Sequence, residues 1–206
     1  MQAPSSPASA ELPARDRILR AAQTLFYGHG VRATGIDRII AEAGVTKVTV
    51  YRHFPSKDDL IRAYLVQRHD TWMAWFKAGL AAYRAAQSPT ERRTRPLMPV
   101  LDVARDWFGA PTFRGCAFAN AIAEVGESVA SVAEIAARHK AELRDAIADL
   151  LPANAAAPGI AWAATLALDG AIMNAQTGAA SIDAALQGLN DLLDALNQSH
   201  AAMTRD

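Results

Sequence analysis

Apolar residues recur along this chain at intervals of three and four positions, which is the spacing of one face of an α-helix. The first such segment is Ala14–His29, where Ile18 and Leu25 mark the apolar face. Two shorter helices are expected over Ile36–Ala43 and Lys47–Phe54. Alternation with period two, which would predict strands, is absent, so the pattern predicts an all-α fold.

A longer helix is expected to begin after Pro55 and to run to about Arg84, with Ser56 as its N-cap. The polar stretch 87–99 contains three prolines and predicts a loop, with room for a short helical piece. Further helices are expected at about 100–108, 115–126, 129–151, 157–178 and 181–199. The hydrophobic pattern therefore predicts about nine helices.

Charge is distributed unevenly along the 206 residues, although the net charge is zero. Residues 1–68 hold 10 Lys and Arg against 6 Asp and Glu, whereas the rest of the chain is net acidic. A local basic excess favours a polyanionic partner. The single cysteine, Cys116, excludes an internal disulfide, and the sequence has neither a secretory signal nor an apolar run that could span a membrane, so we expect a cytoplasmic protein.

The stretch from Thr34 to Phe54 has the layout of a helix-turn-helix. Thr34 is expected to cap the first short helix, with Asp37 in capping-box position. Gly44 suits the left-handed conformation that ends a helix sharply, and Thr46 is expected to cap the second short helix.

The outward face of this second helix carries groups that contact DNA. At about 100° per residue, Val50 and Phe54 fall on one side and face the core. The opposite side and its edges are cationic, hydroxylic and aromatic, which suits contact with phosphates and base edges. Its residues are Lys47, Val48, Thr49, Tyr51, Arg52 and His53.

The run Val45–Leu60 resembles the DNA-binding domain of TetR-family repressors, most specifically through Tyr51, His53, Phe54 and Lys57. The resemblance extends over about residues 15–64. It implies an all-helical homodimer whose subunits join a three-helix DNA-binding domain to a larger helical domain for ligand binding and dimerisation. It also implies double-stranded DNA with a palindromic operator and a small-molecule effector as partners.

The resemblance assigns roles to individual residues. Phosphate contacts are implied for Thr34, Lys47, Tyr51, His53 and Lys57, and base contacts for Val48, Thr49 and Arg52, with Thr46 included in the DNA-binding set. Many relatives have Gly where this chain has Val48, so the base-reading surface differs from theirs. The expected domains are a disordered tail over 1–13, the DNA-binding domain over 14–60, the helical domain over 61–199 and a tail over 200–206.

Aromatic residues in the second half are expected on helices that would surround an apolar sensor cavity, with Glu124 and Asn174 as further polar candidates. The alternative for each is ordinary core packing. The candidates are Trp72, Trp75, Phe76, Trp107, Phe113, Cys116, Asn120, Trp162 and Met173. The resemblance implies that the Ala- and Gly-rich segment 157–199, with the stripe Leu186, Leu189, Leu193 and Leu196, forms the homodimer interface. The alternative is ordinary packing within the subunit.

The sequence thus predicts a repressor that a small apolar or amphipathic ligand releases from its operator. No metal-ligand spacing, nucleophile motif or phosphate loop is present, so we expect neither an enzyme nor a cofactor. Two alternatives stay open. One is a helical small-molecule binding module without DNA binding, and the other is a regulator that senses oxidants or electrophiles through Cys116.

Overall fold

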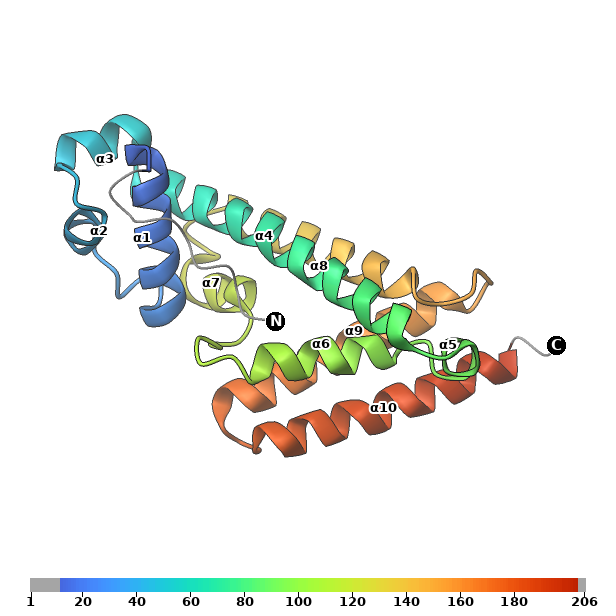
Figure 1. The fold of residues 1–206 in the computed structure, drawn as a ribbon. Helices are drawn as coiled ribbons and strands as arrows, with labels where there is room; N and C mark the ends of the chain where they lie inside the picture. Colours follow the sequence, from blue (N-terminus) through green and yellow to red (C-terminus); the bar gives the residue numbers. More distant parts are fainter. Residues whose placement is uncertain (1–11, 204–206) are drawn as a thin grey trace. The chain divides into compact units, whose positions relative to one another are not determined.

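The computed structural model describes residues 12–203, and the described part consists of ten helices without a strand (Figure 1). The predicted tail over 1–13 lies almost wholly outside the described residues. The helices are α1 (Ala14–His29), α2 (Ile36–Ala43), α3 (Lys47–His53), α4 (Lys57–Ala86), α5 (Pro89–Thr94), α6 (Met98–Phe108), α7 (Ala117–Val125), α8 (Ser131–Ala148), α9 (Ala157–Thr177) and α10 (Ile182–Met203).

The predicted all-α fold class is confirmed, and the helix bounds differ in detail. Helix α5 is the short helical piece for which the predicted loop over 87–99 left room. Its start is a capping box, in which the Ser88 hydroxyl accepts the N–H of Glu91 and the Glu91 carboxylate accepts the N–H of Ser88. Helix α10 continues to Met203, four residues beyond the expected end at Ser199.

The first of two compact units contains the described residues up to His69 together with Ala117–Ala136. In it, α1 packs against α2 and α3, drawn from blue to cyan in Figure 1. Its core includes Ile18, Ile39 and Leu60, and the rings of Phe26 and Tyr64 meet edge to face at 5.4 Å between centroids. The unit therefore combines a local three-helix group with a segment from the middle of the chain.

The second unit contains Asp70–Cys116 together with the described residues from Ala137 onward. Helices α9 and α10 lie side by side in it, and α6 packs against both (Figure 1). Leu186, Leu189 and Leu193 of α10 are buried. The expected apolar stripe on this helix therefore packs within the subunit, which corrects the interpretation that it awaits a partner chain.

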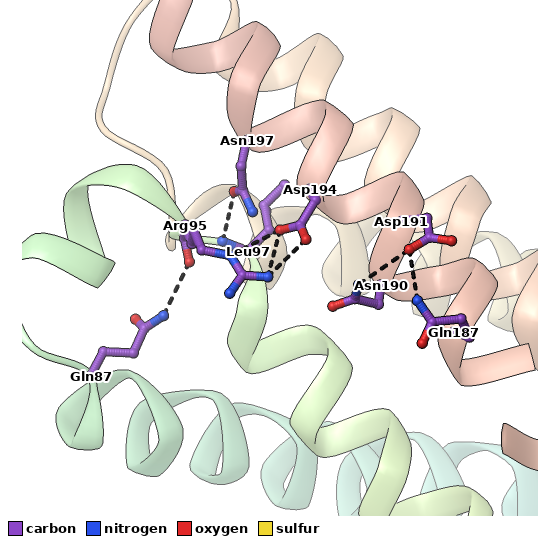
Figure 2. Close-up of polar contacts among 8 residues, drawn as sticks. All are labelled: Gln87, Arg95, Leu97, Gln187, Asn190, Asp191, Asp194 and Asn197. Carbon is purple, nitrogen blue, oxygen red and sulfur yellow. Dashed lines mark hydrogen bonds and ion pairs between the residues drawn. The ribbon is translucent and has the colours of Figure 1, made fainter.

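Polar contacts join the segment before α6 to α10 in this second unit (Figure 2). The Arg95 guanidinium binds both carboxylate oxygens of Asp194, at 2.7 and 2.8 Å. The backbone N–H of Leu97 donates to Oδ1 of Asn197, and the Gln87 side-chain amide donates to the carbonyl of Arg95. The bonds of Arg95 and Leu97 to α10 link residues about a hundred positions apart and fix the start of α6 on α10.

None of the helices between residues 12 and 203 combines the length and apolar character that crossing a bilayer requires. In the same part of the chain, no group of three or more His, Cys, Asp or Glu side chains is placed to hold a metal ion.

Candidate DNA-binding site and aromatic cluster

The corner between α2 and α3 is formed by Gly44, which has φ 60° and ψ 44°. This left-handed conformation is open to glycine at little cost. It lets the N–H of Gly44 reach the carbonyls of Ile40 and Ala41, and the N–H of Val45 donates to Ile40 as well. Helix α2 therefore ends sharply, as its sequence predicts, and the chain turns directly into α3.

Thr46 caps α3 as predicted. Its hydroxyl oxygen accepts the N–H of Thr49 at 3.2 Å, and the two hydroxyls lie 2.8 Å apart. Val50 and Phe54 are buried beneath the helix. These contacts hold α3 by one face and leave the other face outward.

The outward face of α3 carries the residues that the sequence analysis predicted to contact DNA. Val48 is 76% exposed and Tyr51 is 40% exposed. Lys47, Arg52 and His53 are exposed too, while Thr49 is partly buried by its contact with Thr46. The structure thus brings two cations, an imidazole, a phenol and an apolar side chain onto one short helix.

Thr34 has a different place from the one expected. Gly35, rather than Thr34, is the N-cap of α2, and no side chain caps that helix, so the predicted capping box with Asp37 is wrong. The Thr34 side chain is 0% exposed, and its hydroxyl donates to the carbonyl of Gly30 at 2.7 Å. Thr34 therefore fastens the turn after α1, and its hydroxyl is not available to a phosphate in this conformation.

Lys57 also has an internal partner. Its ammonium donates to the carbonyl of Val31 at 2.7 Å, across 26 positions of sequence. The side chain is partly buried, in contrast to the exposed Lys47. Lys57 therefore ties the start of α4 to the turn before α2, and only its remaining ammonium protons are free for a phosphate.

The start of α4 confirms the predicted cap at Ser56. The Ser56 oxygen accepts the N–H of Asp59 at 3.0 Å, and its hydroxyl donates to the Asp59 carboxylate at 2.7 Å. This hydrogen bond, followed by that from Arg62, lowers the pKa of Asp59 below its ordinary value. The first turn of α4 therefore carries an ionised carboxylate where the helix dipole is positive.

Glu124 of α7 contacts the turn that follows α1. Its carboxylate accepts the N–H of Arg32 at 2.8 Å. A Cβ on Gly30, which has φ 90°, would lie 3.0 Å from both carboxylate oxygens. The sequence offered Glu124 as a polar contact for a ligand, whereas the structure uses it inside the first unit to hold the α1–α2 connection.

Four of the predicted ligand-binding aromatics form one cluster in the second unit. The ring of Trp72 stacks on Phe76, with centroids 4.8 Å apart and planes 13° apart, and meets the edge of Trp107 at 5.1 Å. Trp107 in turn meets Phe113 at 5.4 Å. Phe108 completes the group at 5.0 Å from Phe113.

The other predicted ligand residues lie elsewhere. Trp75 is at the edge of the cluster, with its ring centroid 6.1 Å from that of Trp72. Trp162 and Met173 are about half exposed on α9 and have no ring contact with the cluster. Cys116 is buried immediately before α7, and Asn120 lies on α7 in the first unit. The structure thus unites the aromatics of α4 and α6 and separates them from those of α9.

Sequence reasoning missed His139 of α8. This buried imidazole packs against Trp72 with ring centroids 5.1 Å apart. A signal was present, because His139 follows Val132 and Ala136 and precedes Leu143 at the spacing of one helical face. A histidine on an otherwise apolar helix face therefore marked a buried position beside the cluster.

Known proteins resemble this chain over both units. Residues 18–64 match the family described as bacterial regulatory proteins of the tetR family. SCO4454, a TetR-family transcriptional regulator from Streptomyces coelicolor, has 30% sequence identity and a TM-score of 0.76, over 91% of this chain and 96% of its own. The class is that of bacterial regulatory proteins rather than enzymes.

Curated relatives match over the DNA-binding segment. The HTH-type transcriptional regulator TtgR of Pseudomonas putida is 40% identical over 57 residues, which are 28% of this chain and 27% of TtgR. The HTH-type transcriptional activator FasR of Mycolicibacterium smegmatis is 46% identical over 55 residues, or 27% of this chain and 25% of FasR. The matches thus span about a quarter of these relatives. Together with the whole-length match to SCO4454, they place the chain in the TetR family.

Proposed function

We propose that this chain is a DNA-binding transcriptional repressor, which acts as a homodimer on a palindromic operator and leaves it when a small apolar or amphipathic ligand binds. The observation that carries the proposal is the exposed face of α3, held outward by the buried Val50 and Phe54. Two such helices in a dimer fit successive major grooves, about 34–36 Å apart. FasR is named an activator, so the sign of regulation is part of the proposal.

The outward residues of α3 divide into two kinds of contact. Lys47, Tyr51 and His53 bind phosphates, which sets affinity without reading sequence. Arg52 reads a base edge, because a guanidinium forms a bidentate pair with guanine. Val48 meets a thymine methyl, with Thr49 and Thr46 beside it at the start of the helix.

A second copy of the chain is the proposed partner of α9 and α10. Trp162, Leu166 and Met173 project from one side of α9, and Leu192 projects from α10, each about half exposed. A monomer rarely leaves large apolar side chains together on adjacent helices in water. The segment 157–199 therefore supplies the dimer interface through these residues rather than through the buried leucine stripe.

The aromatic cluster of the second unit is the proposed effector site. Trp72 and Phe76 from α4, Trp107 from α6 and Phe113 from the following connection offer apolar ring surface of the kind that binds small molecules. A ligand that binds one conformational state of the dimer better than the other shifts the balance between them, with a coupling of about 1–3 kcal/mol. Operator release follows if the preferred state holds the two α3 helices at the wrong separation.

Selection of bound sequences from a random DNA pool tests the proposal. The full chain is expected to enrich a palindrome with half-sites one helical turn apart. The Arg52→Ala variant is the matched control, because it alters the reading face and leaves Val50 and Phe54 in place. Enrichment of no sequence by the folded, unmodified chain, or equal enrichment by both proteins, would contradict the proposal.

A further inference from the structure

The indole N–H of Trp72 is a buried donor without a hydrogen-bond partner. Trp72 is 8% exposed, and the rings of Phe76, Trp107 and His139 pack against it. Buried tryptophan N–H groups usually find an acceptor, because leaving a polar group unpaired away from water is costly. An unpaired donor inside an aromatic cluster is therefore a position that a ligand can complete.

We propose that Trp72 anchors the effector, and that the effector is a flat, uncharged aromatic molecule carrying a hydrogen-bond acceptor that receives the Trp72 N–H. This inference rests on the proposed function, in which the aromatic cluster is the effector site. It adds the chemical class of the ligand and the atom that recognises it.

The surroundings of Trp72 set the shape and charge of this ligand. Phe76 already stacks on the indole at an angle of 13° between planes, whereas Trp107 and His139 present edges at 62° and 65°. An added ring extends such an arrangement by stacking or edge contact. Among the rings that contact Trp72 in the described part of the chain, only the His139 imidazole can ionise. A charged ligand would lose its hydration here without a strong counter-charge, so an uncharged one is favoured.

Part of the cluster reaches the surface. Trp107 and Phe113 are partly exposed, and Phe113 lies in the connection between α6 and α7, outside any helix. A side chain on such a connection can move without breaking helical hydrogen bonds. Displacement of Phe113 from Trp107 would expose the cluster to an incoming ring while α4 and α6 keep their places.

A matched pair of probes tests the anchor, namely quinoline and naphthalene, which have the same size and differ by one acceptor nitrogen. Their dissociation constants are measured by equilibrium dialysis with the full chain, without DNA. The Trp72→Phe variant keeps a ring and removes the N–H. Tyr27→Phe also keeps a ring and removes one hydrogen-bond donor, on α1 in the first unit, and serves as the control.

The preference for quinoline over naphthalene is expected to be about threefold to tenfold greater in the unmodified protein than in Trp72→Phe, which corresponds to one hydrogen bond. Tyr27→Phe is expected to keep the full preference. An unchanged preference in Trp72→Phe, including equal weakening of both probes, would overturn the inference, and so would failure of quinoline to bind.

The outcomes separate this inference from the regulatory proposal. If the DNA selection yields a palindrome and the probe preference is unchanged in Trp72→Phe, the regulatory proposal is supported and the proposal that Trp72 anchors the effector is contradicted. A preference that depends on Trp72, together with no selected DNA sequence, supports the anchor and removes the regulatory role.

Discussion

The two compact units hold their candidate sites by different kinds of contact. In the first, the reading helix is set by bonds between near neighbours, such as Thr46 with Thr49 and Ser56 with Asp59. In the second, Arg95 reaches Asp194 across 99 positions, and Arg84 donates to the carbonyl of Asp149 across 65. Helix α3 thus depends mainly on contacts within its own segment, whereas the second unit depends on contacts among helices that are distant in sequence.

The largest expected effect comes from the second unit, through the substitution Leu166→Asp. Leu166 is 53% exposed in the subunit, so the variant should fold. Burying a carboxylate in the proposed interface costs several kcal/mol, and symmetry places two of them there. Sedimentation equilibrium should show monomers at micromolar concentration, and operator affinity should fall about a hundredfold or more.

Ala137→Asp places the same charge on an exposed position of α8 and is the control for this change. It should leave both assembly and operator affinity unchanged. A dimeric Leu166→Asp variant would show that the exposed side of α9 is not the interface. Dimerisation would then have to occur through another surface of the chain.

The next largest effect is expected from Arg52→Ala in the first unit. Loss of one bidentate base contact costs about 1–3 kcal/mol of discrimination, or roughly tenfold to a hundredfold in affinity for the preferred site. Affinity for unrelated sequences should change much less. Fluorescence anisotropy with the selected operator and with a scrambled duplex measures both quantities.

Lys47→Ala is the companion variant, because Lys47 is exposed and is proposed to bind phosphate. It should weaken binding to all DNA sequences alike. It should also lower the slope of log affinity against log salt concentration, called the salt slope below, by about 0.9. Equal loss of discrimination in the two variants would contradict the division into base and phosphate contacts.

Lys57→Met tests whether Lys57 stabilises the fold in addition to any contact with DNA. The change keeps the apolar stem and removes the ammonium that donates to Val31. Hydrogen bonds that involve a charged group contribute about 1.5–3 kcal/mol, so the free energy of unfolding should fall by about 1.5 kcal/mol without DNA. Denaturant titration measures this.

The matched substitution Lys47→Met should leave the free energy of unfolding unchanged and should lower the salt slope by about 0.9. Lys57→Met should lower that slope by less, because part of its ammonium is bound within the subunit. An unaltered free energy of unfolding in Lys57→Met would show that the hydrogen bond to Val31 does not stabilise the fold. Lys57 would then be a candidate for phosphate binding alone.

The smallest expected effect is on the pH dependence of stability, through Asp59 in the first turn of α4. The pKa of Asp59 is lowered by Ser56 and Arg62, so the folded state favours the carboxylate. A lowered folded-state pKa contributes stability that is full above the unfolded value, near 4, and is lost as the pH falls through the folded value. The difference in thermal midpoint between the unmodified protein and Asp59→Asn should therefore narrow as the pH falls from about 5 towards 2.

Asp58→Asn is the control for this titration, since Asp58 is exposed in the same helical turn. Its difference from the unmodified protein should depend on pH less than that of Asp59→Asn. A constant difference for Asp59→Asn across the range would show that Ser56 does not stabilise the carboxylate.

The turns and helix caps of the first unit could be predicted from the sequence because they are formed by residues close in sequence. Gly44, Thr46 and Ser56 act as their local patterns predict, because turn and cap contacts span three or four positions. Thr34 was misassigned, since a threonine before a helix usually caps it, and only the fold reveals that its hydroxyl turns back to Gly30. The internal hydrogen bond of Lys57 was missed for a different reason, because its partner Val31 lies 26 positions away.

The second unit was predictable as helices but not as a site. Periodicity placed the helices, yet it does not say which apolar faces meet. The sequence grouped Trp162 with Trp72, whereas the structure leaves Trp162 about half exposed on α9. His139 was passed over because its ring partner, Trp72, lies on a helix far away in sequence. Pairing between helix faces is a tertiary property, and a single sequence carries little information on it.

The contact between Glu124 and the turn after α1 limits how such regulators can be recombined. Because the first unit includes Ala117–Ala136, a DNA-reading module cut after His69 would lack the carboxylate that accepts the N–H of Arg32. A chimaera built by one crossover would pair this turn with a foreign side chain. Grafting a new operator preference onto another sensor therefore calls for two exchanged segments, or for an acidic residue in the host at the position of Glu124.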